Sequence, residues 1–87
     1  MKVKLDFVKR EIAGESFLVP TGEAAARYCG MFALNEIAAL IWDLLPDAKS
    51  EDEIVDRILD EYEVSREQAS ADVSAFLAKL KEMEILG

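Results

Sequence analysis

The fold of this chain is decided by residues 30–45, which read GMFALNEIAALIWDLL. The apolar run at residues 31–34 has the length and the flanks of a β-strand. Asn35 then interrupts it, because its side-chain oxygen can accept a free backbone N–H at the start of a helix. Behind Asn35, apolar residues recur at helical spacing over most of the circumference, so this helix must be covered on more than one side. We therefore predict a strand at residues 30–34 that leads directly into a central core helix at residues 36–45.

A first strand is expected near the start of the chain. Val3, Leu5 and Phe7 alternate with polar residues, which is the period of a half-buried strand. The apolar positions then shift to Val8 and Ile12. A shift of phase indicates an extra residue in one strand, so we predict a bulge or a bend near residues 7–8.

A second strand and its connections complete the predicted sheet. Residues 13–15 read AGE and indicate a turn, and residues 16–19 read SFLV and indicate the second strand. Residues 23–29 contain three alanines, but seven residues are short for a helix, and an irregular hairpin connection is expected there. The three strands form a meander, which leaves the strand at residues 30–34 at an open edge.

The second half of the chain is predicted to be helical. Ser50 with Glu53 and Ser65 with Gln68 each form a capping-box pattern, which marks the start of a helix. An apolar stripe follows each of them. The stripes consist of Ile54, Val55, Ile58, Leu59 and Tyr62, and of Ala69, Val73, Phe76, Leu77, Leu80 and Met83. The apolar tail at residues 85–87 is expected to fold back on the core or the sheet.

These elements predict one α+β domain over residues 1–87, with three N-terminal antiparallel strands followed by three helices. The last two helices are arranged like a helix-turn-helix pair, so the whole is winged helix-turn-helix-like with its strands placed first. The length of 87 residues supports one hydrophobic core and no second domain.

Composition narrows the classes of function. Ten basic and eighteen acidic residues give a formal net charge of −8, which disfavours binding to nucleic acid or to an anionic membrane surface. The chain has no histidine, so the commonest general base and the commonest metal ligand are missing. No apolar run approaches the ~20 residues that cross a bilayer. With one cysteine, Cys29, and no targeting segment, a cytoplasmic protein is expected.

A set of short motifs then resembles the PqqD family. In chain order they are FLVPTG at residues 17–22, Gly30, Leu34-Asn35-Glu36, Ile41-Trp42, Glu53-Ile54-Val55, Glu61-Tyr62, Asp72-Val73, Phe76-Leu77 and Leu80. Each motif alone is weak, but together they cover nearly the whole chain in the expected order.

The resemblance implies a precursor-peptide recognition element, also called a peptide chaperone. Such proteins bind the leader of a ribosomally made precursor peptide and present its core to a modifying enzyme, often of the radical SAM type. In the family, the leader adds a strand to the third strand, beside the third helix. The resemblance therefore implies peptide contacts at Met31, Phe32, Ala33 and Leu34, and at Asp72, Phe76 and Lys79 of the facing helix. It implies no catalytic activity, no cofactor and no metal.

The site residues also have simpler structural interpretations. Either Met31 or Phe32 must face the core, because neighbouring side chains in a strand point to opposite faces. Phe76 belongs to an apolar stripe and is more often core than pocket in such a pattern. Asp72 fits a solvated helix surface or an ion pair with Lys79 or with Arg66. Trp42 is expected in the core.

Three other functions are weighed against peptide binding. A winged-helix DNA-binding regulator is the main alternative, but the start of the last helix, residues 65–68, has too little positive charge to neutralise phosphates. A carrier protein needs a serine in a specific context, and neither Ser50 nor Ser65 has it. An enzyme acting through paired carboxylates has no pair singled out by spacing. The open strand edge leaves both a monomer and a homodimer possible.

Overall fold

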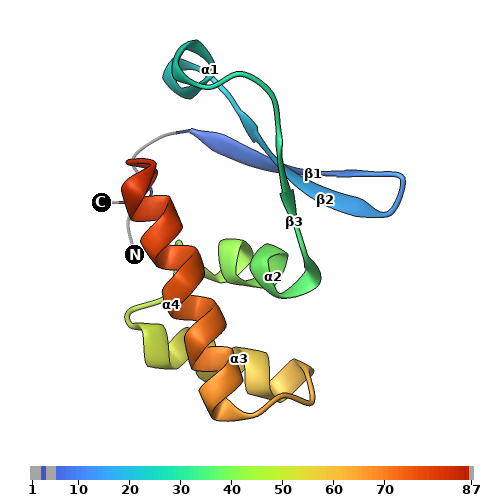
Figure 1. The fold of residues 1–87 in the computed structure, drawn as a ribbon, viewed down its shortest axis with the longest axis vertical. Helices are drawn as coiled ribbons and strands as arrows, with labels where there is room; N and C mark the ends of the chain where they lie inside the picture. Colours follow the sequence, from blue (N-terminus) through green and yellow to red (C-terminus); the bar gives the residue numbers. More distant parts are fainter. Residues whose placement is uncertain (1–2, 4–5, 87) are drawn as a thin grey trace.

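The computed structural model describes Val3 and residues 6–86. Its elements follow in the order β1 (Phe7–Ile12), β2 (Glu15–Pro20), α1 (Glu23–Arg27), β3 (Phe32–Leu34), α2 (Glu36–Leu44), α3 (Glu51–Glu61) and α4 (Arg66–Glu82). Figure 1 shows the sheet and α1 at one end of the molecule, α2 and α3 toward the other, and α4 running beside both. The predicted α+β fold of three antiparallel strands and three main helices is confirmed, with the short α1 added between β2 and β3.

The sheet has the order β1-β2-β3, so the predicted meander is correct. β1 pairs with β2 residue for residue from Phe7↔Pro20 to Ile12↔Glu15, and the predicted bulge near residues 7–8 is therefore wrong. The apolar residues at this hairpin do not follow one phase because its far end projects beyond the core (Figure 1), where Ile12 is 48% exposed. The prediction for Leu5 lies outside the described residues.

The C-terminal tail folds back, as predicted for the residues that the structure describes. Ile85 and Leu86 are buried, and Leu86 forms an isolated antiparallel bridge with Val3. Val3 therefore pairs with the tail of the chain, outside the three-stranded sheet. Gly87 lies outside the described residues.

Helix α1 corrects the prediction of an irregular connection. No side chain caps its start, and its first N–H groups bond to the carbonyl groups of Thr21 and Gly22. Tertiary contacts stabilise it instead: Ala24 is fully buried, and the hydroxyl group of Tyr28 donates to the carbonyl of Met83 beyond α4. A five-residue helix is too short to be stable alone, so these distant contacts decide its conformation.

The inner face of the sheet carries an aromatic cluster. The ring centroids of Phe7, Tyr28 and Phe32 lie 5.8 to 6.0 Å apart in tilted and edge-to-face arrangements, which are favourable geometries. On β1, Lys9 forms an ion pair of 2.5 Å with Asp43, so the same sheet is also tied to α2.

Three side chains cap the main helices where the sequence predicts them. Asn35 accepts a hydrogen bond from the N–H of Ala38 at the start of α2. Ser50 and Ser65 accept from the N–H groups of Glu53 and Gln68 at the starts of α3 and α4. The second half of each box differs from the pattern. The Glu53 carboxylate accepts from the N–H of Lys49, and the Gln68 amide donates to Asp72.

The core lies between the sheet and the three main helices. Its most buried large side chains are Leu18, Ile41, Leu45, Ile54, Ile58, Val73, Leu80 and Ile85. They come from β2, from α2 or the residue after it, from α3, from α4 and from the tail, so one core joins the sheet, the helices and the C-terminal end. Trp42 is half-buried and packs against the edge of this core.

Candidate functional site

Strand β3 is a free edge of the sheet. Its pairs are Ser16↔Leu34, Phe17↔Ala33 and Leu18↔Phe32, all with β2, and no other strand of the described chain lies on its far side. Phe32 and Leu34 are half-buried and Ala33 is exposed, which is the alternation of a strand with one covered face. An edge strand presents unpaired N–H and C=O groups that another extended chain can satisfy.

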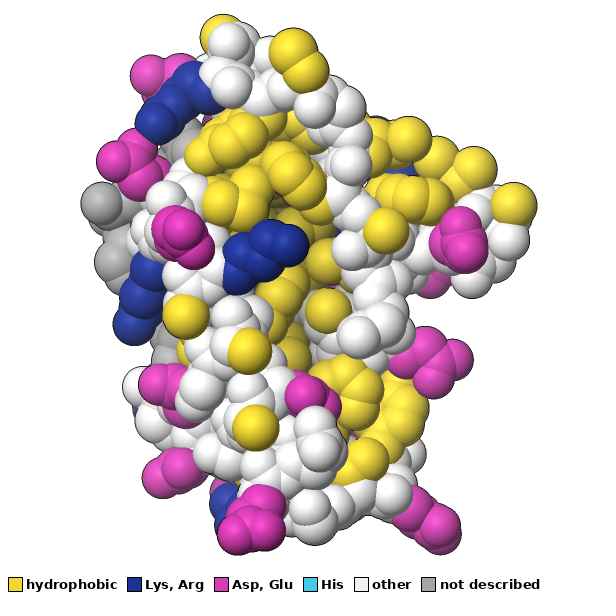
Figure 2. Space-filling model, viewed as in Figure 1, with side chains coloured by type: hydrophobic (Ala, Val, Ile, Leu, Met, Phe, Trp, Pro, Cys, Tyr) yellow, Lys and Arg dark blue, Asp and Glu magenta, His cyan; other side chains and the backbone are white. Residues whose placement is uncertain are grey.

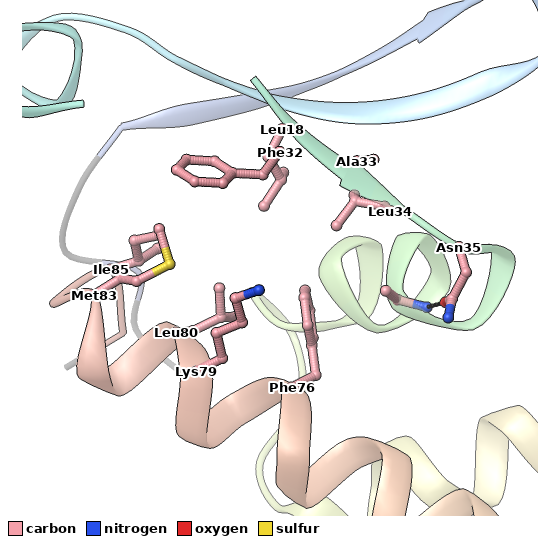
Figure 3. A pocket seen from close by; sticks show the side chains of 11 residues that line it. Leu18, Phe32, Ala33, Leu34, Asn35, Phe76, Lys79, Leu80, Met83 and Ile85 are labelled. Carbon is pink, nitrogen blue, oxygen red and sulfur yellow. Dashed lines mark hydrogen bonds between the residues drawn. The ribbon is translucent and has the colours of Figure 1, made fainter. Parts of the chain in front are cut away.

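A hollow of about 140 Å³ lies beside this edge, between β3 and the C-terminal half of α4. Figure 3 shows Phe32 and Leu34 pointing from the sheet side, and Phe76, Lys79 and Met83 from the α4 side or just beyond it. The complete lining is Leu18, Phe32, Ala33, Leu34, Asn35, Ala38, Phe76, Lys79, Leu80, Met83 and Ile85. Nine of these eleven side chains are apolar, so the hollow suits an apolar side chain.

A second hollow of about 270 Å³ continues the first one past the end of β3, between α2 and α4. The two share Asn35, Ala38, Phe76 and Lys79, and the second adds Ile37, Ile41, Asp72 and Ala75. We call the two together the β3–α4 groove. Figure 2 shows its surface as a band of hydrophobic side chains, with a basic side chain crossing the middle.

Charge in the groove comes from two side chains on α4. Lys79 is exposed and forms no ion pair with any residue that the structure describes. Asp72 accepts a hydrogen bond of 2.9 Å from the Gln68 amide, so neither predicted ion pair of Asp72 forms. Arg66 instead pairs with Asp56 at 2.5 Å, and this hydrogen bond raises the pKa of Arg66. The groove therefore holds one cation that is available to a ligand.

The last residue of α1 and the residue after it contact the chain just beyond α4, next to the Met83 end of the groove. Arg27 at the end of α1 pairs with Glu84 at 2.6 Å, and the hydrogen bond and charge of Glu84 raise the pKa of Arg27. Tyr28 donates to the Met83 carbonyl. These contacts connect the region between β2 and β3 to the end of α4.

The structure brings together six of the seven residues implied by the family resemblance. Phe32, Ala33, Leu34, Phe76 and Lys79 line the first hollow, and Asp72 lines the second. Met31 is the exception: it lies just before β3, is 52% exposed, and lines none of the hollows around the groove.

Sequence reasoning missed several lining residues. They are Leu18, Asn35, Ala38, Leu80, Met83 and Ile85. Met83 and Leu80 were placed in the apolar stripe of the last helix, and Asn35 was identified only as a helix cap. Residues that serve the core or a cap on one side and the groove on the other give no separate signal in a sequence.

The described residues contain no group of three or more acidic, cysteine or histidine side chains arranged to hold a metal ion. Cys29 is an exposed free thiol between α1 and β3. In the same part of the chain, none of the helices combines the length and the apolar character that a bilayer crossing requires.

The chain has clear relatives among known families and structures. The family model for coenzyme PQQ synthesis protein D (PqqD) matches residues 18–86. TbiB1 in complex with the TbiA(beta) leader peptide is 32% identical, with a TM-score of 0.73 over 99% of this chain and 94% of TbiB1. Lasso peptide synthetase B1 complexed with the leader peptide is 25% identical, with a TM-score of 0.72 over 97% and 93% of the two chains.

A search of curated proteins gives no match. The family match nevertheless covers the groove completely, because every residue that lines it, from Leu18 to Ile85, lies within residues 18–86. The fold prediction, the resemblance of the motifs and the family match agree. The chain belongs to the PqqD family.

Proposed function

We propose that this chain captures the leader segment of a ribosomally made precursor peptide and presents the precursor to a modifying enzyme. The observation that carries the proposal is the free edge of β3 beside an apolar groove. Two structures similar in fold over nearly the whole chain hold a leader peptide, which supports the same class of ligand here.

Strand addition explains how such a site would bind. An extended leader pairs its backbone with β3 at a spacing of about 4.8 Å, and this pairing supplies affinity without depending on sequence. Every second leader side chain then points into the groove, where Phe32 of β3, Phe76 of α4 and Met83 just beyond α4 form an apolar surface. The groove therefore selects leaders with apolar residues at alternate positions.

The role is binding without catalysis. The proposed partner is a peptide-modifying enzyme, and a radical SAM enzyme remains a prediction from the family resemblance. A lasso peptide synthetase system is the other candidate, because one similar structure is a lasso peptide synthetase B1. The two are distinguished by testing which enzyme, purified with the precursor, modifies it faster when this chain is added.

The test of strand addition uses a leader peptide that this chain binds, either the TbiA(beta) leader or the leader of a precursor found beside this gene, with single N-methyl groups placed along its backbone. N-methylation removes one N–H donor, so we expect affinity to fall at every second position of the paired segment and to change little between them. Equal losses at all positions, or no loss at any, would contradict strand addition.

The matching change in the protein is Ala33→Pro, which removes a backbone N–H from β3. We expect an affinity loss of about 5- to 100-fold, since one buried polar group is left unsatisfied. Ala33→Thr is the control, because it retains the N–H at the same exposed position. Amide NMR signals of α2, α3 and α4 should stay in place in both variants, and unchanged binding by Ala33→Pro would exclude this edge.

A further inference from the structure

We propose that Asn35 is a positioning residue for the leader: its side-chain amide donates a hydrogen bond to a backbone carbonyl of the peptide where the peptide leaves β3. The inference rests on the proposed function and adds a contact that fixes the register of the bound peptide. It follows from the orientation of one side chain, from its place in the groove, and from the charges around it.

The cap on α2 determines which end of the Asn35 amide is free. Oδ1 accepts a hydrogen bond of 2.8 Å from the N–H of Ala38, and only the oxygen of an amide can accept. Nδ2, with two donor hydrogens, is therefore the end left over. No hydrogen bond within the described residues uses Nδ2, and the residue is exposed. Figure 3 shows this arrangement, with the oxygen bonded toward α2.

Asn35 stands where the strand edge ends. Leu34 is the last residue of β3 and Glu36 is the first of α2, so a peptide paired with β3 loses its backbone partners at this point. Asn35 lines both hollows of the β3–α4 groove, and it also lines a third hollow of about 330 Å³ on the side of residues 14–16. It is the polar side chain common to all three. A peptide that continues from β3 into the α2–α4 part of the groove must pass it.

The charges around Asn35 favour a neutral acceptor. Glu36 is exposed beside it and would repel a carboxylate of the ligand. Lys79 on α4, which forms no ion pair within the described part of the chain, offers an acidic side chain a better partner. A peptide carbonyl carries no net charge and is present at every residue. The contact therefore fixes where along the groove the leader sits, and leaves the choice of its side chains to the apolar walls.

Three substitutions separate this donor from the cap. Asn35→Asp keeps an oxygen that can accept from the N–H of Ala38 and has no donor. Asn35→Ser also keeps the acceptor, and it replaces the amide donor by a hydroxyl group on a shorter side chain. Asn35→Ala removes cap and donor together. The probes are two synthetic peptides, namely the TbiA(beta) leader and the leader of any precursor peptide found encoded beside this gene. Binding is measured by calorimetry and stability by thermal melting.

We expect Asn35→Asp and Asn35→Ser to keep the melting temperature of the parent and to bind the cognate leader about three- to ten-fold more weakly. The loss in Asn35→Asp should persist at high salt, because a missing donor is not screened. Unchanged affinity in Asn35→Asp overturns the inference, and a loss in Asn35→Asp that disappears at high salt assigns the effect to charge and also overturns it.

Failure of the proposed function gives a different result. If the parent chain binds neither leader, the proposed function and this inference fall together. If the parent binds and all three variants bind equally well, leader binding stands and only the role of Asn35 is wrong. If only Asn35→Ala loses affinity for the leader, and its melting temperature is lower, then the helix cap alone matters and the proposed donor role of Asn35 is overturned.

Discussion

Helix α4 has two faces whose residues recur every three or four positions, but only one of the two faces is buried in the core. One face carries Ala69, Val73, Leu77 and Leu80, which are 0 to 2% exposed. The other carries Asp72, Phe76, Lys79 and Met83, which are half-buried or exposed. Asp72, Phe76 and Lys79 each directly precede a core residue in the sequence. Met83 lies about one turn beyond the last of these pairs. The two faces are therefore about 100° apart on one helix.

The difference between the faces lies in what covers them. The core face packs against α2, α3 and the tail, whereas the groove face looks across to β3 with a hollow between. Phe76 and Met83 are left half-exposed, although burying them would stabilise the fold by about 1.5 kcal/mol or more each. This comparison predicts that changes on one face alter stability and that changes on the other alter peptide binding.

The largest effect is expected on the core face. Leu77→Ala leaves a cavity beside fully buried neighbours, and the free energy of unfolding should fall by about 2–5 kcal/mol. Urea unfolding measures this loss. Leader affinity, measured at a temperature where the variant is folded, should change less than twofold. A large loss of affinity in the folded variant would show that the two faces are not independent.

The groove face should behave in the opposite way. Phe76→Ala removes an aromatic side chain that lines both hollows, and the affinity for the leader should fall by about 10-fold or more. Stability should change by less than for Leu77→Ala because Phe76 is already half-exposed. Phe76→Leu is the matched control and should retain most of the affinity. A variant Phe76→Ala that is strongly destabilised but binds normally would place Phe76 in the core.

A third substitution tests the start of α4 without touching either face. Ser65 accepts the N–H of Gln68, and Ser65→Ala should lower the free energy of unfolding by about 1 kcal/mol. Ser65→Asp keeps an acceptor and should be neutral or slightly stabilising. Leader affinity should stay at the level of the parent in both variants. Reduced binding in Ser65→Ala alone would mean that the groove depends on the precise position of the whole helix.

The cap at Ser65 also shows what a sequence can predict. Caps at Asn35, Ser50 and Ser65 depend on residues three positions apart, so the chemistry that fixes them is visible in the sequence. The starts of the three main helices were accordingly predicted correctly. The apolar strand at the sheet edge was also predicted, although it is shorter than expected and excludes Met31.

The predictions that failed concern parts of the chain whose conformation depends on contacts with residues far away in the sequence. Helix α1 depends on the burial of Ala24 and on the contact of Tyr28 with the end of α4, and no pattern within residues 23–29 records these contacts. The groove is similar, because its lining comes from β2, β3, α2, α4 and the tail. The family resemblance implied residues on both walls of the groove. It did not imply that Asn35, which caps α2, also lines both hollows.

The smallest effect is expected for charge in the groove. Lys79 is a cation of the groove that pairs with no acidic group among the described residues, and the chain has a net charge of −8. An acidic leader residue would therefore be attracted to Lys79 and repelled by most of the remaining surface. Lys79→Gln should weaken leader binding about two- to five-fold at low salt, as for other exposed ion pairs.

Salt separates this contribution from packing. The Debye length falls from about 30 Å at 0.01 M to about 3 Å at 1 M, so Lys79→Gln and the parent should bind equally at the higher salt, whereas Phe76→Ala stays weaker at both. Lys79→Arg keeps the charge and should match the parent throughout. If Lys79→Gln loses affinity equally at both salts, the contribution of Lys79 comes from its alkyl chain packing over the hollow. The groove face would then select by shape alone, and the acidic surface would have no part in choosing the leader.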